Sequence, residues 1–203
     1  MREIRLTKGY VAKVDDEDYD WLMQYSWHTL QCGTETGRKR LREHDIARTA
    51  IPVALPDGYN AYRIVSMHVL IMRALPGEIV DHINGDPLDN RRENLRLVTN
   101  QQNAWNARGA KSFNGKPTTS RFKGVFKKTC KTKYGNYEYF VARVKFNDKD
   151  VTLYHGKDEI AAACHYDYGA LRCFGEYARP NFDGAAYDKW YNDKHGATEC
   201  VPD

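Results

Sequence analysis

A stretch of twelve residues near the middle of the chain, GAKSFNGKPTTS at positions 109–120, constrains the fold more than any other feature. It consists mostly of small, polar and turn-forming residues, so it cannot add much to a hydrophobic core on either side. The 203 residues are therefore expected to fold as two modules. We place an N-terminal domain at residues 1–110, a linker at 111–120, a second domain at 121–182 and a C-terminal tail at 183–203.

Hydrophobic patterns in residues 1–75 predict a platform of mixed strands and helices. IRLTKGYVAKV is typical of a short hairpin, DDEDYDWLMQYSW of a helix with an acidic start, and YNAYRIVSMHVLIMRAL of a strand that runs into a helix. CGTETGRKRLREHD, at residues 32–45, is interpreted as a basic loop. The candidate core residues are Trp21, Trp27, Leu70 and Ile71.

Membrane and secretion signals are not expected. No apolar run approaches the roughly 18 residues of a transmembrane helix, and the start, MREIRLTKGY, lacks the apolar core of a signal peptide. The five cysteines are odd in number, and no two have the C-x-x-C spacing. Neither a disulfide framework nor structural zinc is therefore expected. We expect a cytoplasmic protein with no membrane partner.

Positive charge is concentrated between Arg108 and Lys149. This window contains twelve Lys or Arg residues against two acidic ones, whereas the net charge of the whole chain is only +4. A solvated, lysine-rich face would account for the charge alone. Because Phe and Tyr are interleaved with the basic residues along strand-like segments, the window favours a polyanionic partner, and nucleic acid fits best.

One short region of the N-terminal domain combines strand signals with an unusually polar loop. EIVDHI, at residues 78–83, predicts a strand, NGDPLDNRRE predicts a turn-rich loop, and NLRLVT predicts a second strand. Thr99 and Gln102 have the spacing of a capping box, so a helix should begin after Thr99. The expected order is strand, loop, strand, helix.

Four polar residues of this region could form one site. Asp81 and His82 lie where the first strand passes into the loop, and the following helix brings Asn103 towards them. A carboxylate oxygen and an amide oxygen are hard ligands that suit Mg²⁺ and leave positions for water and phosphate oxygens. His82 can take a proton from water near neutral pH, and the amide of Asn94 could hold the loop. The alternative is ordinary surface hydrogen bonding and turn chemistry.

Residues 80–108, VDHINGDPLDNRRENLRLVTNQQNAWNAR, resemble the HNH endonuclease family, which has a ββα-metal fold. The likeness is to the branch found in phage and intron-associated homing endonucleases, where Asp-His replaces His-His. It implies that Asp81 and Asn103 bind a divalent ion, that His82 is the general base, and that Asn94 is the central structural asparagine. Asn103 stands where many relatives carry His.

The resemblance also implies hydrolysis of DNA phosphodiester bonds with Mg²⁺ or Mn²⁺, leaving 5′-phosphate and 3′-hydroxyl ends. One site cuts one strand in each encounter, so we expect a monomer that nicks double-stranded DNA rather than a dimer. Arg91, Arg92 and Arg96 are interpreted as phosphate contacts, and His68 as a structural histidine. The expected origin is a phage or another mobile element.

Residues 121–182 resemble the ethylene-response-factor type of DNA-binding domain. The segments FKGVFKK, YFVARVKF and AAACHYDYGALRCFGEYARPNF carry the likeness, and Phe140 stands where that family usually has Trp. The resemblance implies a three-stranded sheet in the DNA major groove with a helix packed behind it. We expect turns near Gly135 and at residues 147–148, then a helix that Asp158 caps and Gly175 ends.

The predicted fold class is α+β. It comprises an N-terminal α/β platform with a ββα-metal nuclease unit at about residues 78–108, followed by a three-stranded antiparallel sheet packed on one helix. On this arrangement the helix turns Ala161, Ala162, Tyr166 and Ala170 towards the sheet, and the opposite sheet face presents basic residues to DNA. The basic residues are Arg121, Lys123, Lys127, Arg143 and Lys145.

Three functions remain open on the sequence alone. The first is a DNA endonuclease of homing or mobile type whose C-terminal domain chooses the target. The second is a DNA-binding regulator with a degenerate HNH unit, and the third is an RNA-processing nuclease, since basic sheets with aromatic residues also bind RNA. The basic loop, with Arg38, Lys39, Arg40 and Arg42, could help clamp DNA, or residues 1–75 could be only a platform for the nuclease hairpin.

Overall fold

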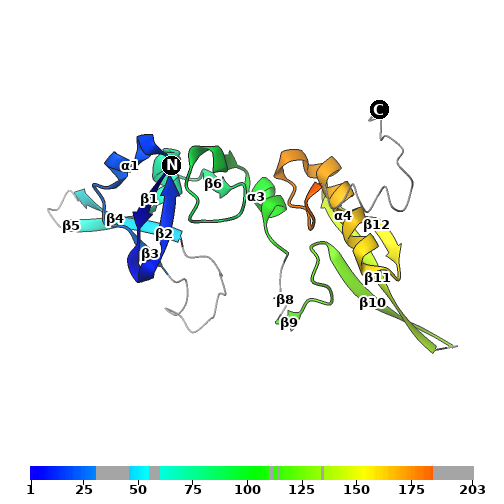
Figure 1. The fold of residues 1–203 in the computed structure, drawn as a ribbon. Helices are drawn as coiled ribbons and strands as arrows, with labels where there is room; N and C mark the ends of the chain where they lie inside the picture. Colours follow the sequence, from blue (N-terminus) through cyan, green and yellow to red (C-terminus); the bar gives the residue numbers. More distant parts are fainter. Residues whose placement is uncertain (31–45, 55–59, 110–111, 114, 134, 185–203) are drawn as a thin grey trace. The chain divides into compact units, whose positions relative to one another are not determined.

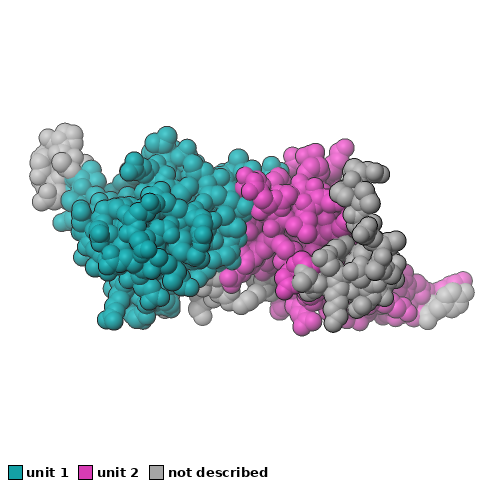
Figure 2. Space-filling model, turned by 45° about the horizontal axis from the view of Figure 1, so that its top comes forward, with its two compact units in different colours: residues 1–104 teal, residues 105–203 magenta. Residues whose placement is uncertain are grey.

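The computed structural model describes residues 1–30, 46–54, 60–109, 112–113, 115–133 and 135–184 (Figure 1). The chain divides into two compact units, Met1–Ala104 and Trp105–Asp203 (Figure 2). Most of the predicted tail and the basic loop with Arg38, Lys39, Arg40 and Arg42 lie outside the described residues. Within the described part of the chain, no helix is both long and apolar enough to cross a membrane.

Unit 1 begins with the predicted hairpin and helix (Figure 1). Strands β1 (Arg2–Arg5) and β2 (Val11–Val14) pair antiparallel through a 3₁₀ turn at Thr7–Gly9, and α1 (Asp16–Leu22) follows. All three residues of the first turn of α1 are acidic, and this placement suits the positive end of the helix dipole.

A second sheet in unit 1 was only partly predicted. It has the order β3–β4–β5, formed by β3 (His28–Leu30), β4 (Ile46–Ala54) and β5 (Asn60–Ser66). Strand β5 runs directly into α2 (Met67–Ile71), as the sequence pattern indicated. The first two strands were missed because β3 is only three residues long and Pro52 interrupts the pattern of β4.

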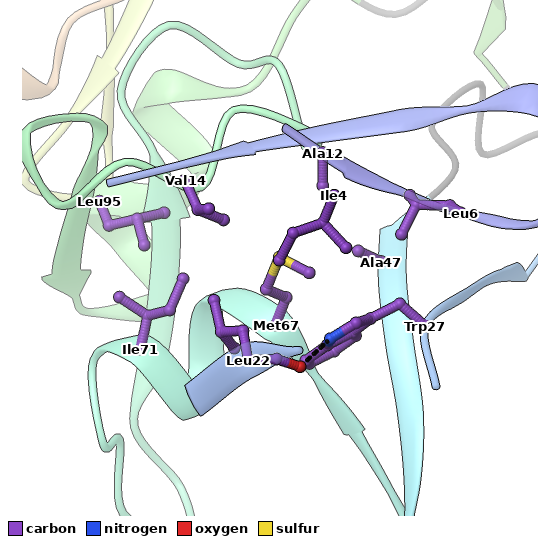
Figure 3. Close-up of a cluster of buried hydrophobic side chains, with 10 residues drawn as sticks. All are labelled: Ile4, Leu6, Ala12, Val14, Leu22, Trp27, Ala47, Met67, Ile71 and Leu95. Atoms are coloured by element: carbon purple, nitrogen blue, oxygen red, sulfur yellow. Dashed lines mark hydrogen bonds between the residues drawn. The ribbon is translucent and has the colours of Figure 1, made fainter. Parts of the chain in front are cut away.

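The core of unit 1 joins the β1–β2 hairpin, α1, β4, α2 and the strand that begins at Leu95 (Figure 3). Buried side chains from both sheets and from α1 and α2 meet there: Ile4, Leu6, Ala12, Val14, Leu22, Trp27, Ala47, Met67, Ile71 and Leu95. The indole Nε1 of Trp27 donates a hydrogen bond to the backbone oxygen of Leu22 at 2.8 Å, so its polar atom is satisfied. The predicted core residues Trp21 and Leu70 are partly buried and pack against this cluster.

The last elements of unit 1 have the predicted order of strand, loop, strand and helix. Strands β6 (Ile79–His82) and β7 (Leu95–Val98) form an antiparallel hairpin with a 3₁₀ turn at Arg92–Asn94, and α3 (Asn100–Asn106) follows. The capping box is confirmed. Thr99 Oγ1 accepts from the backbone N–H of Gln102 at 3.2 Å, and Gln102 Oε1 accepts from that of Thr99 at 2.9 Å.

Unit 2 contains the predicted antiparallel meander and helix. The sheet order is β10 (Val125–Thr132), β11 (Gly135–Phe146) and β12 (Lys149–Gly156), with α4 (Glu159–Phe174) packed on it. A 3₁₀ turn at Gly175–Tyr177 follows α4. Two short strands within the predicted linker, β8 (Ser112–Phe113) and β9 (Lys116–Pro117), pair with each other.

The predicted turn and cap signals of unit 2 are confirmed. Asn147 and Asp148 have φ values of 48° and 60° and form the tight turn between β11 and β12. The Asp158 side chain accepts from the backbone N–H groups of Ile160 and Ala161 at 2.9 and 3.0 Å, and Gly175 ends α4 with φ 55°. Mixed helices and small sheets in both units are consistent with the α+β class.

The sheet and helix of unit 2 meet in a core of small and aromatic residues. Its buried members are Val125, Ala142, Val144, Ala162, Ala163, Tyr166, Ala170 and Phe174. Trp105 stacks on Phe174 with ring centroids 4.5 Å apart. Gly124, at φ 73°, lets the chain pass directly over the Tyr166 ring, because a Cβ at this position would lie 1.9 Å from ring carbons.

We predict that Gly124→Ala destabilises unit 2 by more than the cost of its left-handed backbone. That backbone alone costs an L-residue about 1–2 kcal/mol, and the overlap with Tyr166 adds core strain. Gly115→Ala is the matched control, because Gly115 has φ 76° and open space around the position of its Cβ. Urea unfolding should show a clearly larger loss for Gly124→Ala, and equal losses would contradict this packing.

Candidate functional site

The polar residues that suggested chemistry lie on the β6–β7 hairpin. Asp81 and His82 are the last two residues of β6, and each retains only 9% of its surface exposed. A substrate must therefore reach them through this small exposed part. Their position next to the loop makes the geometry of the loop the main determinant of the site.

Asn94 ties the two ends of the loop together. Its Oδ1 accepts from the backbone N–H of Asn84 at 3.0 Å, and its Nδ2 donates to the backbone oxygen of Asp89 at 2.7 Å and to Asn84 Oδ1 at 3.1 Å. Its own backbone oxygen accepts from Ile83, directly after His82, at 2.9 Å. Asn94 is buried, so these bonds are made away from water and fix the exit of β6.

A buried carboxylate inside the loop adds a second set of bonds. Asp89 accepts from Asn84 Nδ2 at 2.9 Å and, in a bidentate pair, from Nε and Nη2 of Arg91 at 2.8 Å each. The hydrogen bonds from Arg91 lower the pKa of Asp89 below its ordinary value. Arg91 also pairs with Glu93. The loop thus contains a carboxylate that stays charged and organised.

The loop is anchored to the rest of unit 1 through β2 and α1. The backbone of Lys13 bonds Leu88 and Asn90, each at 2.8 Å. Arg92 forms two hydrogen bonds, at 2.8 and 2.7 Å, with Asp18, which is almost fully buried in α1. These bonds raise the pKa of Arg92. Residues far apart in the sequence therefore hold the hairpin in place.

Asn90 orients the ring of His82. The side chain of Asn90 is fully buried, and its Oδ1 lies 3.4 Å from His82 Nε2. With Nε2 protonated, this contact is a hydrogen bond donated to Asn90 Oδ1, and Nδ1 then carries the basic lone pair. Burial lowers the pKa of His82, although the Asn90 bond and the charge of Asp81 oppose the shift. His82 is therefore neutral at neutral pH, as a proton acceptor must be.

His68 lies beside His82. The two rings meet edge to face with centroids 4.9 Å apart. Burial, followed by the charge effects of His82 and Arg48, lowers the pKa of His68 to about 3. Among the described residues, the buried atoms without a hydrogen-bond partner include Arg48 Nε, His68 Nδ1 and Asn90 Nδ2. The ring contact gives His68 a direct packing role at the candidate base.

The carboxylate of Asp81 faces a cation of the protein. Arg96, its directly opposed partner in the hairpin, donates from Nε and Nη2 to Asp81 Oδ2 at 3.2 and 3.1 Å. Asn103 is exposed on α3, and its backbone N–H donates to the oxygen of Thr99 at 3.0 Å. Its place in a metal site stays a prediction.

The donor chemistry fits a hard divalent ion held mainly by non-protein ligands. No three His, Cys, Asp or Glu side chains of the described residues gather closely enough to hold a metal ion. One carboxylate, Asp81, and one amide, Asn103, would leave several coordination positions to water and phosphate, as Mg²⁺ commonly requires. The paired guanidinium of Arg96 shows that Asp81 already serves as an anion towards a cation.

The basic residues of unit 2 do not all lie where the sequence placed them. Arg143 and Lys145 alternate with Ala142 and Val144, which pack towards α4, so they lie on the open sheet face. Lys127 was predicted on that face, which is wrong. It pairs opposite Phe140, a residue packed against the α4 cluster, and its ammonium contacts Glu138.

Arg121 and Lys123 precede the sheet rather than lying on a strand. Arg121 is exposed, with its guanidinium 4.8 Å from the centroid of the Phe122 ring. The prediction that Lys123 points away from the helix on a strand is wrong, because its ammonium donates to the backbone oxygen of Trp105. Burial lowers the pKa of Lys123 to about 8.

Comparisons with known proteins find a family model and relatives that resemble parts of the chain. Residues 67–105 match the sequence model of the family described as HNH endonuclease. The chain is 28% identical over 175 residues to "Uncharacterized HNH endonuclease L560" of Acanthamoeba polyphaga mimivirus, covering 86% of this chain and 76% of that protein. It is 35% identical over 69 residues to "Protein 3.8" of Escherichia phage T7, covering 32% of this chain and 53% of that protein. No solved structure matches the chain.

The family match spans α2, the β6–β7 hairpin and most of α3, the elements that carry His68, Asp81, His82 and Asn94. These findings define the protein as a nuclease, a hydrolase of phosphodiester bonds. More particularly, the match over residues 67–105 is to an HNH endonuclease domain.

Sequence reasoning missed several residues that shape the site. Asn90 and Asp89 were read only as turn formers, and Asp18 only as part of an acidic helix start. The signal that could have found Asn90 and Asp89 is their position between two predicted strands, where a polar loop needs internal partners. Nothing in the sequence pattern pairs Asp18 with Arg92, because the contact spans 74 residues.

We predict that His68→Phe flattens the pH dependence of stability. Between the native pKa of about 3 and the ordinary value of 6.5, only the unfolded state binds a proton at His68. The free energy of unfolding should therefore fall as pH falls from 6.5, by up to about 1.4 kcal/mol per pH unit for this group. Urea unfolding at several values between pH 7 and pH 5 should give a smaller slope for His68→Phe.

Leu22→Val is the control for that experiment, since it weakens the same core without removing a titrating group. It should lower stability at every pH and keep the wild-type slope. A wild-type slope in His68→Phe would show that His68 is not held neutral by the fold.

Proposed function

We propose that the protein is a divalent-metal-dependent DNA endonuclease of homing or mobile type. It hydrolyses phosphodiester bonds of double-stranded DNA with Mg²⁺ or Mn²⁺, and as a monomer it nicks one strand in each encounter. The β6–β7–α3 segment is its ββα-metal unit, and the sheet of unit 2 selects the target. A virus and a phage as sources of the two relatives fit a mobile origin.

The observation that carries the proposal is the state of His82. Its Nε2 faces the carbonyl oxygen of Asn90 at 3.4 Å, its pKa is lowered by burial, and it directly follows Asp81 on a strand end braced by Asn94. A structural surface histidine has no need of a neighbouring carboxylate, a buried orienting amide and a cross-linked loop. A general base needs a neutral ring held in a fixed orientation, which burial and these contacts support.

The residues divide the chemistry between them. His82 takes the proton of the attacking water at Nδ1, and Asn90 keeps the ring in the tautomer that allows this. Asp81 and Asn103 would hold the divalent ion, which when bound supplies positive charge for the pentacovalent phosphorus and the departing 3′ oxygen. Asn94 contributes by holding the loop backbone at Asn84 and Asp89. The products carry 5′-phosphate and 3′-hydroxyl ends.

The open face of the β10–β11–β12 sheet is the proposed DNA-reading surface. Arg143 and Lys145 lie there with Phe126 and Tyr139, and the Arg143 guanidinium is 5.2 Å from the centroid of the Phe126 ring. Asp150 holds the same guanidinium at 2.9 Å. A guanidinium positioned from two sides is well placed to donate to a guanine edge, whereas lysines mainly contact phosphates.

We predict that wild-type protein converts supercoiled plasmid to open circles with Mg²⁺ or Mn²⁺ and that His82→Ala does not. Loss of a general base should lower the nicking rate by about 10²- to 10⁴-fold. Asn90→Ala should lower it by about 10- to 100-fold, because the ring loses its orienting partner. Excess EDTA should stop nicking by the wild type.

His28→Ala serves as the control, because His28 lies on β3 and has no assigned role in the site. Its nicking rate should match the wild type. Wild-type protein that binds DNA tightly but produces no open circles would instead support the alternative function, a DNA-binding regulator with a degenerate HNH unit.

We predict that Arg143→Ala weakens DNA binding and Lys127→Ala does not. Each change removes one positive charge from the same sheet, but only Arg143 is on the open face. Arg143→Ala should raise the dissociation constant by about tenfold and lower the salt slope by about one unit. Fluorescence anisotropy with labelled duplex at several salt concentrations measures both. Equal effects of the two variants on DNA binding would show that the open face of the sheet is not the DNA-binding surface.

A further inference from the structure

The ion pair between Arg96 and Asp81 distinguishes Arg96 from the other arginines of the hairpin. Arg91 pairs with Asp89 and Glu93, and Arg92 pairs with Asp18 and Glu17. These acidic residues brace the loop. Arg96 instead pairs with the carboxylate that the proposed function assigns to the divalent ion.

The geometry makes Arg96 a competitor for that carboxylate. The two residues are directly opposed in β6 and β7, and two guanidinium bonds, at 3.2 and 3.1 Å, go to the same oxygen, Oδ2. Both side chains are largely buried, so solvent screens their charges only weakly. A divalent ion at Asp81 would lie within a few ångströms of the guanidinium, and two cations sharing one carboxylate repel each other.

A phosphodiester would relieve this conflict. Its anionic oxygens can accept hydrogen bonds from the guanidinium and ligate the divalent ion at the same time. The favourable arrangement then has the ion on Asp81 and Arg96 on the phosphate. Without the phosphate, Arg96 is best placed on Asp81, which is where the structure has it.

We propose that Arg96 is a positioning residue that makes divalent-metal binding at Asp81 depend on the substrate phosphate. It weakens metal binding by the protein alone, and it strengthens metal binding in the DNA complex by turning to the phosphate. The inference rests on the proposed function, because it takes Asp81 as the metal ligand. Its consequence is positive coupling between metal and DNA binding, which by linkage is the same in both directions.

The first test measures Mn²⁺ binding to the full-length protein without DNA by the EPR signal of free Mn²⁺. Asp81→Asn defines the background, so only Asp81-dependent binding is counted. Arg96→Gln removes the competing charge and should tighten this binding by about tenfold or more. Arg96→Lys keeps a cation and should stay close to the wild type. Arg63→Gln, which removes an exposed charge on β5, should also match the wild type.

The second test measures coupling. The affinity for a fluorescent duplex is determined by anisotropy with EDTA and with Ca²⁺, which serves as a hard, oxygen-preferring probe. Ca²⁺ should tighten DNA binding by the wild type by about tenfold. In Arg96→Gln this gain should shrink to about twofold or less. Thermal unfolding of each variant shows that the comparison is between folded proteins.

The outcomes separate this inference from the proposed function. If Mn²⁺ binds in an Asp81-dependent manner but equally well in wild type and Arg96→Gln, the role of Arg96 is wrong and the nuclease proposal stands. If no variant shows Asp81-dependent binding and wild-type protein does not nick DNA, the metal site itself is wrong. Weaker Mn²⁺ binding in Arg96→Gln than in wild type would overturn the inference directly.

Discussion

The three side-chain hydrogen bonds of Asn94 carry the geometry of the site. A loop of this length between two four-residue strands has many conformations, and fixing each residue costs about 1–2 kcal/mol in backbone entropy. The amide of Asn94, at the end of the loop, bonds to the backbone N–H of Asn84 near the start of the loop and to the backbone oxygen of Asp89 in its middle. Since Asn94 is buried, removing it would leave those groups unpaired at a high desolvation cost. The position of His82 at the end of β6 depends on this cross-link.

Asp81 and His82 are equally buried, and the fold gives the two neighbouring groups different partners. Burial lowers the pKa of His82 and so favours the neutral ring, while the carbonyl oxygen of Asn90 at Nε2 orients that ring. Asp81 needs to remain an anion although it is equally buried, and the guanidinium of Arg96 compensates its charge. Adjacent positions on one strand end thus have separate electrostatic environments.

Local signals in the sequence predicted most helices, strands and turns. Contacts between residues far apart in the sequence could not be predicted. The Thr99 capping box, the Asp158 cap and the turn at Asn147–Asp148 each depend on residues within four positions, so the sequence alone determines them. The bond between Arg92 and Asp18 spans 74 residues and has no periodic signature. Lys127 was assigned to the wrong face because strand register, not residue type, decides which side chains share a face.

The docking of the hairpin loop on β2 and α1 sets the smallest piece that can be transplanted into another protein. The segment that matches the family, residues 67–105, omits Lys13, Asp15 and Asp18. The Lys13 backbone donates one hydrogen bond to the loop and accepts another, Asp15 accepts from the backbone N–H of Arg92, and Asp18 accepts from the Arg92 guanidinium. A fragment limited to residues 67–105 would contain this polar loop without the residues that anchor it in the full chain. A nuclease fragment of this protein that is to be fused to another protein therefore has to begin at β1.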